Sequence, residues 1–328
     1  MTRSPTILVT NVSGSLGQGV LRLLQSTAPS CRRVGISTDR VSAANHLCDV
    51  VHHVPWRYDR LGDADAATVV EICERESVQL IIPCTDVETV VLSKNAARLP
   101  PLACSGFETS RLFYDKYLTA GAFEAAGIPF AESMLPSAYD GRFPGCVVKP
   151  REGGLSVGVV FDPQAPTSFS DDYVIQRRYE GTEITTALYV TRTGKLLGHI
   201  TLERELRHGI TFKCSVTHRF DQAISEIASR MARSFDIRGA CHIQSIATRV
   251  GRVVPFEVNC RVSGTASIRA QFGFEDIRYL VEEHLFCREP AAPALRSGCA
   301  VRFVADVIYP NVKLDEVRDG DRSEHYLF

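Results

Sequence analysis

The chain has 328 residues, and its 37 lysines and arginines almost balance its 38 aspartates and glutamates. This length accommodates two or three domains with a large core, and the hydrophobic share of 45% is that of a globular protein. The net charge of −1 provides no basic field, which argues against nucleic-acid binding. No apolar run reaches the length of a membrane span, no signal peptide is seen, and the eleven cysteines are scattered without a Cys-x-x-Cys pair, so we expect a cytoplasmic protein with free thiols.

Strands and helices alternate over the first hundred residues. Apolar, β-rich runs at 6–10, 33–37 and 78–82 are separated by helical patterns at 20–24 and around 66–75. This alternation predicts a parallel sheet with helices on both faces.

A glycine-rich turn after the first of these strands suggests one possible enzyme class. Its sequence, 14–19, together with Asp39 after the next strand, is similar to a dinucleotide-binding fingerprint. An NAD-dependent reductase or epimerase is therefore one candidate. Against it, the glycine spacing is GxxGxG rather than GxGxxG, and the Tyr-x-x-x-Lys match from Tyr309 to Lys313 contains Pro310, which disfavours a helix.

A lysine on a strand and a glycine-rich loop form a candidate phosphate contact. Lys149 lies on a predicted strand at 146–150, the loop 151–158 contains three glycines, and 159–161 is predicted to be the next strand. Glycines let backbone N–H groups approach phosphates closely, although a plain hairpin explains the same pattern. Because the loop joins two strands, it is not a Walker A loop. A third strand, from residue 173, leads into a connector whose Glu183 is suited to accept a hydrogen bond from a ribose hydroxyl.

Polar side chains alternate along a later strand, 254–262, in a pattern typical of a metal–phosphate site. In an extended chain Glu257, Asn259 and Arg261 share one face, while Phe256 and every second residue after it, up to Val262, share the apolar face. Carboxylate and amide oxygens are ligands for Mg²⁺, and a guanidinium binds phosphate oxygens. An ordinary half-buried strand would look the same.

The preceding strand, 239–248, supplies a further ligand. A two-residue hairpin centred on 250–251 places Gln244 directly opposite Glu257. Val-Gly is not a favoured two-residue turn, so a bulge could shift this register.

The order of these motifs resembles that of the ATP-grasp superfamily, and most closely its carbamoyl-phosphate synthase large-subunit type and small relatives that ligate a carboxylate to an amine. The resemblance rests on Lys-Pro before a glycine-rich β-loop, then Gly-x-Glu after a strand, then Gln…Glu-x-Asn-x-Arg, and it extends to 81–95 and to Asp115-Lys116 with 125–129. It implies an α/β fold with an N-terminal Rossmann-like (pre-ATP-grasp) parallel-sheet domain over 1–109. A two-lobed α+β ATP-grasp domain follows, with a lid subdomain over 110–183 and a C-terminal subdomain with the metal site over 184–328.

The resemblance also implies an activity. It predicts an ATP-dependent ligase that joins a small-molecule carboxylic acid to an amine, an amino acid or ammonia through an acyl phosphate, with ADP and phosphate as products. Nucleotide contacts would come from Lys116, Lys149, Gly153, Gly154, Ser156, Gly158, Gln176, Arg177, Arg178, Tyr179 and Glu183. Mg²⁺, or Mn²⁺, would bind Gln244, Glu257 and Asn259, while Arg261 and Lys149 would be catalytic by contacting phosphate. Many ATP-grasp enzymes carry an acidic residue at the position of Gln244, so a neutral ligand leaves more metal charge for the nucleotide to balance.

The sequence leaves the acid, the amine and the oligomeric state open, a homodimer included. Thr85 and Asp86 would contact a substrate amine, or they cap a helix over 87–92. Four basic residues lie around a turn at 205–210: Arg204, Arg207, His208 and Lys213. Some of them would bind the substrate carboxylate or the transferred phosphate, or they belong to a solvated charged loop.

A non-catalytic nucleotide-binding module is the third class considered. Such a module would keep Lys149 but lose the metal ligands, and the intact Glu257-x-Asn259-x-Arg261 argues against it. Elsewhere the pattern predicts helices at 221–235 and 274–286 and a last strand at 300–308.

Overall fold

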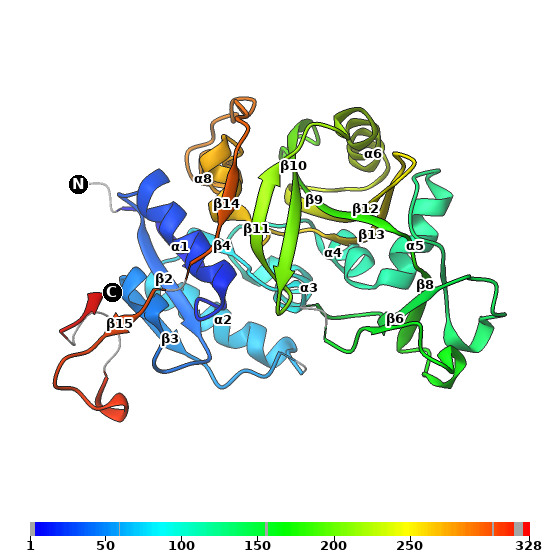
Figure 1. The fold of residues 1–328 in the computed structure, drawn as a ribbon. Helices are drawn as coiled ribbons and strands as arrows, with labels where there is room; N and C mark the ends of the chain where they lie inside the picture. The colour runs from blue at the N-terminus through cyan, green and yellow to red at the C-terminus, as the bar shows by residue number, and fades with distance from the viewer. Residues whose placement is uncertain (1–3, 59, 155–156, 304, 318–323) are drawn as a thin grey trace.

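The structure, a computed structural model, describes residues 4–58, 60–154, 157–303, 305–317 and 324–328. Three sheets follow one another across the molecule, and a short strand pair lies near the C-terminus (Figure 1). The first sheet is parallel and the other two are antiparallel, which confirms the predicted fold class.

The N-terminal sheet has the strand order β3-β2-β1-β4. Its strands are β1 (Thr6–Val9), β2 (Arg32–Ser37), β3 (Val50–His53) and β4 (Leu80–Ile82), and its helices are α1 (Ser15–Thr27), α2 (Asp63–Glu76) and α3 (Asp86–Lys94). Alternate residues of β1 join two different cores, Ile7 one and Leu8 the other, as expected for strands covered on both faces. The chain passes from β1 to β2 on one side and returns to β4 on the other, so the carboxyl edge between β1 and β4 is a switch point of the kind where ligands bind.

The glycine-rich turn after β1 has a packing role. A Cβ atom on Gly17 would lie 2.4 Å from the backbone oxygen of Asn11, a separation that real Cβ atoms do not show. Gly17 therefore lets the turn after β1 pack closely against α1, which begins at Ser15, five residues earlier than the hydrophobic pattern predicts. The Tyr309–Lys313 segment is not helical, as Pro310 predicts.

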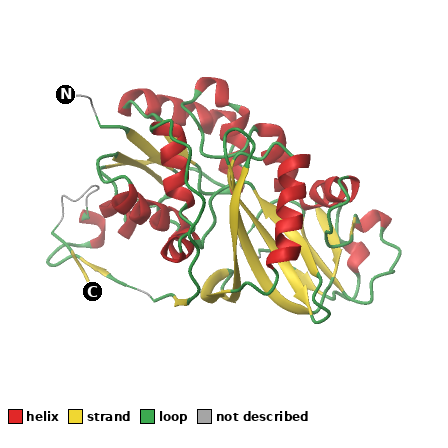
Figure 2. Ribbon diagram, turned by 90° about the horizontal axis from the view of Figure 1, so that it is seen from above, coloured by secondary structure: helices red, strands yellow, loops and turns green. Residues whose placement is uncertain are grey.

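The lid lobe holds a small antiparallel sheet of order β5-β8-β6-β7. Helices α4 (Phe107–Tyr114) and α5 (Lys116–Ala125) precede it, and its strands are β5 (Ser133–Met134), β6 (Cys146–Pro150), β7 (Val160–Phe161) and β8 (Tyr173–Arg177). Both ribbon views place this sheet at the end of the molecule furthest from the N-terminus (Figures 1 and 2).

The large lobe is a six-stranded sheet of order β13-β12-β9-β10-β11-β14. Its strands are β9 (Gly181–Val190), β10 (Leu196–Arg207), β11 (Ile210–Val216), β12 (Gly239–Thr248), β13 (Val253–Asn259) and β14 (Cys299–Val301). Its helices are α6 (Asp221–Ser234), α7 (Ala266–Arg269) and α8 (Asp276–Leu285). Short 3₁₀ segments complete the chain: Ala43–Leu47, Ala96–Arg98, Pro136–Ala138, Pro166–Ser168, Ala270–Phe272 and Leu314–Glu316.

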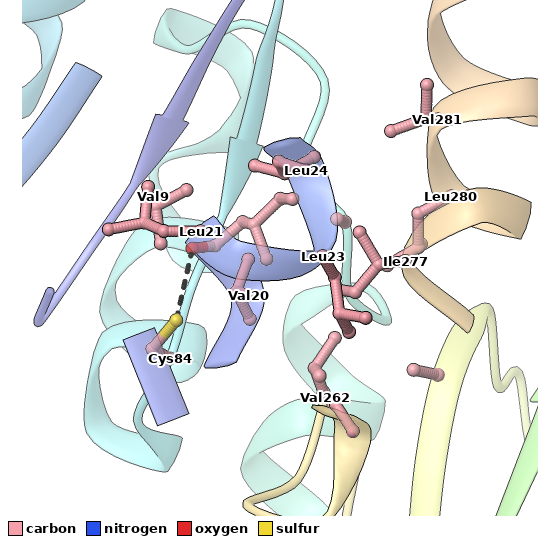
Figure 3. Packing of buried hydrophobic residues seen from close by; sticks show 14 of the residues in the cluster. Val9, Val20, Leu21, Leu23, Leu24, Cys84, Val262, Ile277, Leu280 and Val281 are labelled. Atoms are coloured by element: carbon pink, nitrogen blue, oxygen red, sulfur yellow. Dashed lines mark hydrogen bonds between the residues drawn. The ribbon is translucent and has the colours of Figure 1, made fainter. Parts of the chain in front are cut away.

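One hydrophobic core joins the N-terminal sheet to the large lobe. Leu23 of α1 packs with Ile277 of α8 and with Val262, which follows the end of β13 (Figure 3). β13 ends at Asn259, three residues before the end of the predicted strand, and because Val262 is fully buried in this shared core, the chain just after β13 is held against the N-terminal domain.

The C-terminal residues differ from the prediction of one strand over 300–308. Two short strands take its place, β14 and β15 (Val307–Ile308), and β15 pairs with β16 (Tyr326–Leu327). β14 pairs with β11 through three residues, from Cys299 opposite Ser215 to Val301 opposite Lys213. The rings of His325 and His46 stack with centroids 3.7 Å apart, so this segment lies against the N-terminal domain.

The domain limits at 109 and 183 stay a prediction. The first falls inside α4, and the second lies two residues after the start of β9. Across the described ranges no helix has the length and apolar character that a membrane span requires. All eleven cysteines are free thiols.

Candidate nucleotide and metal site

Gln244 and Glu257 are directly opposite each other on β12 and β13, as predicted, but the hairpin reaches this register by another route. The N–H of Thr248 donates to the carbonyl of Arg252, so the turn has three residues instead of two. This offset would misalign the pair by one position. An extra residue on β13, Phe256, restores the alignment, because the pairing passes from Ser245–Pro255 directly to Gln244–Glu257.

The bulge changes the role predicted for Phe256. Its side chain does not join Val258 and Cys260 in the core behind the sheet; the ring lies 4.9 Å from Lys149 Nζ instead. Its backbone carbonyl accepts from Lys149 Nζ at 3.2 Å and from Gln176 Nε2 at 3.4 Å. The prediction that Phe256 belongs to the apolar face is therefore wrong, and the residue links the large lobe to the lid.

A chain of hydrogen bonds joins the predicted metal ligands. Gln244 Nε2 donates to Glu257 Oε1 at 2.9 Å, and Asn259 Nδ2 approaches the same oxygen at 3.4 Å. On the other side, Arg204 Nη2 donates to Gln244 Oε1 and also to Glu183 Oε1, the latter at 2.5 Å. Arg204, predicted to contact substrate, thus lies between the predicted ribose contact and the predicted metal ligands.

Lys149 is 5% exposed and is held beside this cluster by the carbonyl of Phe256. Burial lowers the pKa of Lys149 to about 7; the negative charge of Glu257 opposes this shift and the nearby Lys116 adds to it. The buried amine of Lys149, with the carboxylates of Glu257 and Glu183 nearby, is therefore poised to gain a proton when an anion binds.

The lid contributes a hinge and a loop. Gln176 is 3% exposed and donates to Ser133 Oγ at 3.0 Å as well as to Phe256. The three hinge residues that follow it point to carboxylates of the lid surface: Arg177 and Tyr179 to Glu132, and Arg178 to Asp162.

The backbone of the glycine-rich loop is anchored by Lys116. Lys116 Nζ donates to the carbonyl of Gly153 at 2.8 Å. Gly153 has φ +102°, which favours glycine, and the space beside it is open, so its backbone is accessible to a ligand. Gly154 is exposed, Gly158 also has a positive φ, and Ser156 lies outside the described residues.

Arg261 lies just beyond the end of β13 and reaches the N-terminal domain. Its Nη2 donates to Asp86 Oδ2 at 2.5 Å, and its Nη1 donates to the carbonyl of Val262 at 2.9 Å. Burial favours the neutral form of Arg261, but the negative charge of Asp86 outweighs this and raises its pKa. The structure therefore brings two predicted site residues from different domains into contact.

Thr85 adopts the alternative role of a helix cap. Its hydroxyl accepts from the N–H of Glu88 at 3.2 Å and donates to Glu88 Oε2 at 2.8 Å. Glu88 is fully buried, also accepts from Thr10 Oγ1 at 2.8 Å, and burial raises its pKa to about 6.

The outer charged residues of the β10–β11 hairpin pair with one another. Arg207 lies 3.5 Å from the ring centre of Phe212, while Arg207 and Lys213 approach Glu205 at 3.7 and 3.6 Å. His208 has φ +49° and occupies the turn. The structure thus separates these residues from Arg204, which points into the cluster.

The cluster suits a hard cation such as Mg²⁺. Asn259 is 5% exposed, and its Oδ1 has no hydrogen-bond partner among the described residues, which leaves a buried ligand atom available. Glu257 supplies the charge. Gln244 Oε1 is already engaged by Arg204, so it fits a cation less well than the other two. In the part of the chain that the structure describes, no three His, Cys, Asp or Glu side chains gather where they could hold a metal ion, so a cation here would depend on the amide oxygens as well as on Glu257.

Several solved structures share this arrangement of lobes. N5-carboxyaminoimidazole synthetase from Staphylococcus aureus, complexed with ADP, matches with a TM-score of 0.71 over 94% of this chain and 83% of its own, at 13% identity. The biotin carboxylase domain dimer of Hydrogenobacter thermophilus 2-oxoglutarate carboxylase, solved with MgADP, ADP and bicarbonate, matches with a TM-score of 0.71 over 100% of this chain and 86% of its own, at 12% identity. The chain has the ATP-grasp fold. At these identities the likeness establishes the fold alone.

Sequence similarity agrees with the ATP-grasp fold over a shorter stretch. A D-alanine–D-alanine ligase of Roseobacter denitrificans (strain ATCC 33942 / OCh 114) is 33% identical over 100 residues, which is 27% of this chain and 31% of the relative. The match thus spans about a third of the curated relative. No family model matches the chain.

The roles of three contributors to this candidate site could not be predicted from the sequence. The carbonyl of Phe256 takes its position from a β-bulge, and no residue type in the sequence indicates that bulge. Asp115 caps α5 and binds Arg151 at 2.5 Å, which fixes the start of the glycine-rich loop. The resemblance included Asp115 beside Lys116 but assigned no role to Asp115 or to Arg151. Ser133 has a neutral side chain on a two-residue strand and carries no sequence signal.

Proposed function

We propose that the protein is an ATP- and Mg²⁺-dependent ligase that joins a small-molecule carboxylic acid to an amine, an amino acid or ammonia through an acyl phosphate. The observation that carries this proposal is that Lys149 of the lid and Arg261 both lie close enough to Glu257 to feel its negative charge, while Arg261 also reaches Asp86 of the N-terminal domain. Together they offer two cations for phosphate and a carboxylate for a metal, and the ATP-grasp fold supports the same reading.

The nucleotide would lie between β8 and β13. Gln176 and Lys149 already share the carbonyl of Phe256 at this position, so both side chains are pre-oriented. Lys149 would contact phosphate oxygens and hold its proton there. The loop anchored by Lys116 would cover the phosphates with its backbone N–H groups and exclude water.

Glu257 and Asn259 would hold the metal, with Gln244 orienting Glu257 through its amide nitrogen. When bound, Mg²⁺ supplies charge neutralisation for the phosphates. Arg204 makes a second contribution, because its guanidinium fixes both Glu183 and Gln244 and places a permanent positive charge beside the cluster. These residues would keep their geometry during the reaction, which favours stabilisation of developing charge.

The chemistry needs no side-chain nucleophile. An oxygen of the substrate carboxylate attacks the γ-phosphorus, the bond to the bridging oxygen breaks, and ADP leaves. The amine then attacks the acyl carbon, the bond from that carbon to the phosphate oxygen breaks, and the amine loses a proton as the amide forms. Lys149 and Arg261 would balance the charge that builds up on the transferred group.

Trapping of the activated acid tests the proposal. The protein is incubated with ATP, Mg²⁺, hydroxylamine and a panel of carboxylic acids, and both ADP and hydroxamate are measured. We expect one class of acids to give the two products together, and Glu257→Gln to abolish both. ADP release without hydroxamate for every acid that stimulates turnover would contradict the acyl-phosphate route.

A further inference from the structure

Asp86 links the carboxyl edge of the N-terminal sheet to Arg261, the predicted phosphate contact, which lies far away in the sequence. It is the first residue of α3, at the carboxyl edge of β4 beside β1, where parallel sheets of this type bind ligands. Arg261 belongs to the other domain and would bind the terminal phosphate. In the structure these two side chains bind each other at 2.5 Å.

The pair is largely removed from solvent. The side chains of Asp86 and Arg261 are 13% and 15% exposed, so separating them without new partners would leave two poorly hydrated charges. The Nε of Arg261 has no partner among the described residues, which leaves donor capacity for an anion. Asp86 lies in the first turn of α3, where the helix dipole favours a carboxylate.

The phosphate loop lies next to the same pair. A Cβ atom built on Gly154 would be 4.0 Å from Asp86 Oδ2, so Gly154 of the loop lies beside this carboxylate. Glu152 of the loop also binds Arg111 of α4 at 3.0 Å. A phosphate under the loop and the carboxylate of Asp86 would therefore compete for the Arg261 guanidinium.

We propose that Asp86 withholds Arg261 from phosphate until a cationic group of the amine substrate binds Asp86. The exchange replaces one buried ion pair by two, Asp86 with the substrate ammonium and Arg261 with phosphate, so neither charge is left unpaired. The exchange couples the contact between Arg261 and the terminal phosphate to occupancy of the amine site. When the amine is absent, it limits phosphoryl transfer to water. This inference rests on the proposed function, since it needs a nucleotide between the lobes.

Asp86→Asn tests the coupling, with Asp63→Asn as its matched control. Asp63 is likewise the first residue of a helix, α2, but its partner is the exposed Lys94. Calorimetric titration of inorganic phosphate into the MgADP complex measures the phosphate affinity, which depends on whether Arg261 is available to bind phosphate. We expect phosphate to bind Asp86→Asn about tenfold more tightly than the parent protein and Asp63→Asn equally well. Asp86→Ser is measured alongside, as a second variant that removes the carboxylate and leaves the Thr85 cap of α3 in place.

Ammonium is the probe for the substrate cation. In the parent protein, ammonium chloride should tighten phosphate binding relative to sodium chloride at equal ionic strength, and this effect should vanish in Asp86→Asn. Equal phosphate affinity in the parent and both Asp86 variants would overturn the inference, as would an ammonium effect that persists without Asp86. Failure of the parent protein to bind MgADP would instead refute the proposed function, so the two failures are distinguishable.

Discussion

Glu257 receives two amide donors on a single oxygen: Gln244 Nε2 at 2.9 Å and Asn259 Nδ2 at 3.4 Å. Both amides thus hold the carboxylate by one oxygen, while the other oxygen accepts no hydrogen bond from the described residues. This one-sided support makes Glu257 the centre of the proposed metal site, and it is the residue whose substitution says most about that site.

Glu257→Gln should abolish turnover while it leaves the fold intact. The glutamine carbonyl can still accept from Gln244, so we expect the melting temperature to change little, while loss of the carboxylate removes metal charge compensation. The measurement is substrate-dependent ADP release beside a melting curve, at several Mg²⁺ concentrations. Partial rescue at high Mg²⁺ would indicate direct ligation, whereas near-normal turnover would show that Glu257 is an ordinary strand residue.

Lys149→Ala should weaken MgATP binding more than Glu183→Ala does. Lys149 supplies a full charge to phosphate, whereas a ribose contact of Glu183 is one charge-assisted hydrogen bond, worth about 1.5–3 kcal/mol before solvent screening. Glu183 also shares its oxygen with Arg204, which lowers its expected contribution further. Calorimetry on the two variants decides the order. Unchanged affinity in Lys149→Ala would mean that the phosphates lie elsewhere.

Proton uptake should accompany nucleotide binding above neutral pH. The pKa of Lys149 is about 7 because of its burial, so at about pH 8 the free protein holds this amine mainly neutral, and phosphate favours its charged form. Titration in buffers with different ionisation enthalpies should therefore reveal uptake of up to one proton at about pH 8 and much less at about pH 6. Lys149→Arg should take up none. Identical uptake in that variant would assign the proton to another group.

The lowered pKa of Lys149 also determines how the free energy of unfolding changes with pH. A lysine with a lowered pKa binds its proton more tightly in the unfolded chain, so burial of the charge opposes folding below about pH 7. That penalty is relieved as the pH rises from about 7 towards about 10.4. Lys149→Met should therefore flatten this part of the stability profile, measured by urea unfolding.

The ion pair of Arg269 with Asp276 should be the costliest of the described pairs to break. Both side chains are almost fully buried, and Arg269 Nη1 also donates to Ser263 and Thr265 at 2.6 and 2.8 Å, which shapes the loop after Arg261. Asp276→Asn should lower the unfolding free energy by about 3–5 kcal/mol, because it leaves a buried guanidinium unpaired. Denaturant unfolding measures this, with the exposed Asp140→Asn as a control that should change little. A loss below about 1 kcal/mol would mean that the pair is dispensable.

The parts of the site that could be predicted from the sequence are those set by the alternation of side chains along a strand and by the order of the strands. The pairing of Gln244 with Glu257 could be predicted because a hairpin and a period of two restrict the register. The position of Phe256 could not be predicted. A longer turn and a bulge compensate each other, so the pairing of Gln244 with Glu257 is unchanged, but the side chain of Phe256 points away from the apolar face.

Contacts between residues far apart in the chain could not be predicted from the sequence. Asp86 and Arg261 are 175 positions apart, and nothing local to either residue indicates that they meet. Their contact depends on the shared core of α1, α8 and Val262, which is a product of tertiary packing. Arg204 was likewise predicted from its neighbours in a charged turn, but a two-residue period along β10 turns it towards Glu183 instead.

Parallel calorimetric titrations with MgATP and with NADH test the central claim most directly, because they oppose the site between the lobes to the glycine-rich turn after β1. The account predicts that MgATP binds the parent protein, that Lys149→Ala weakens this binding, and that NADH gives no saturable heat. Tight NADH binding without a response to MgATP would contradict it.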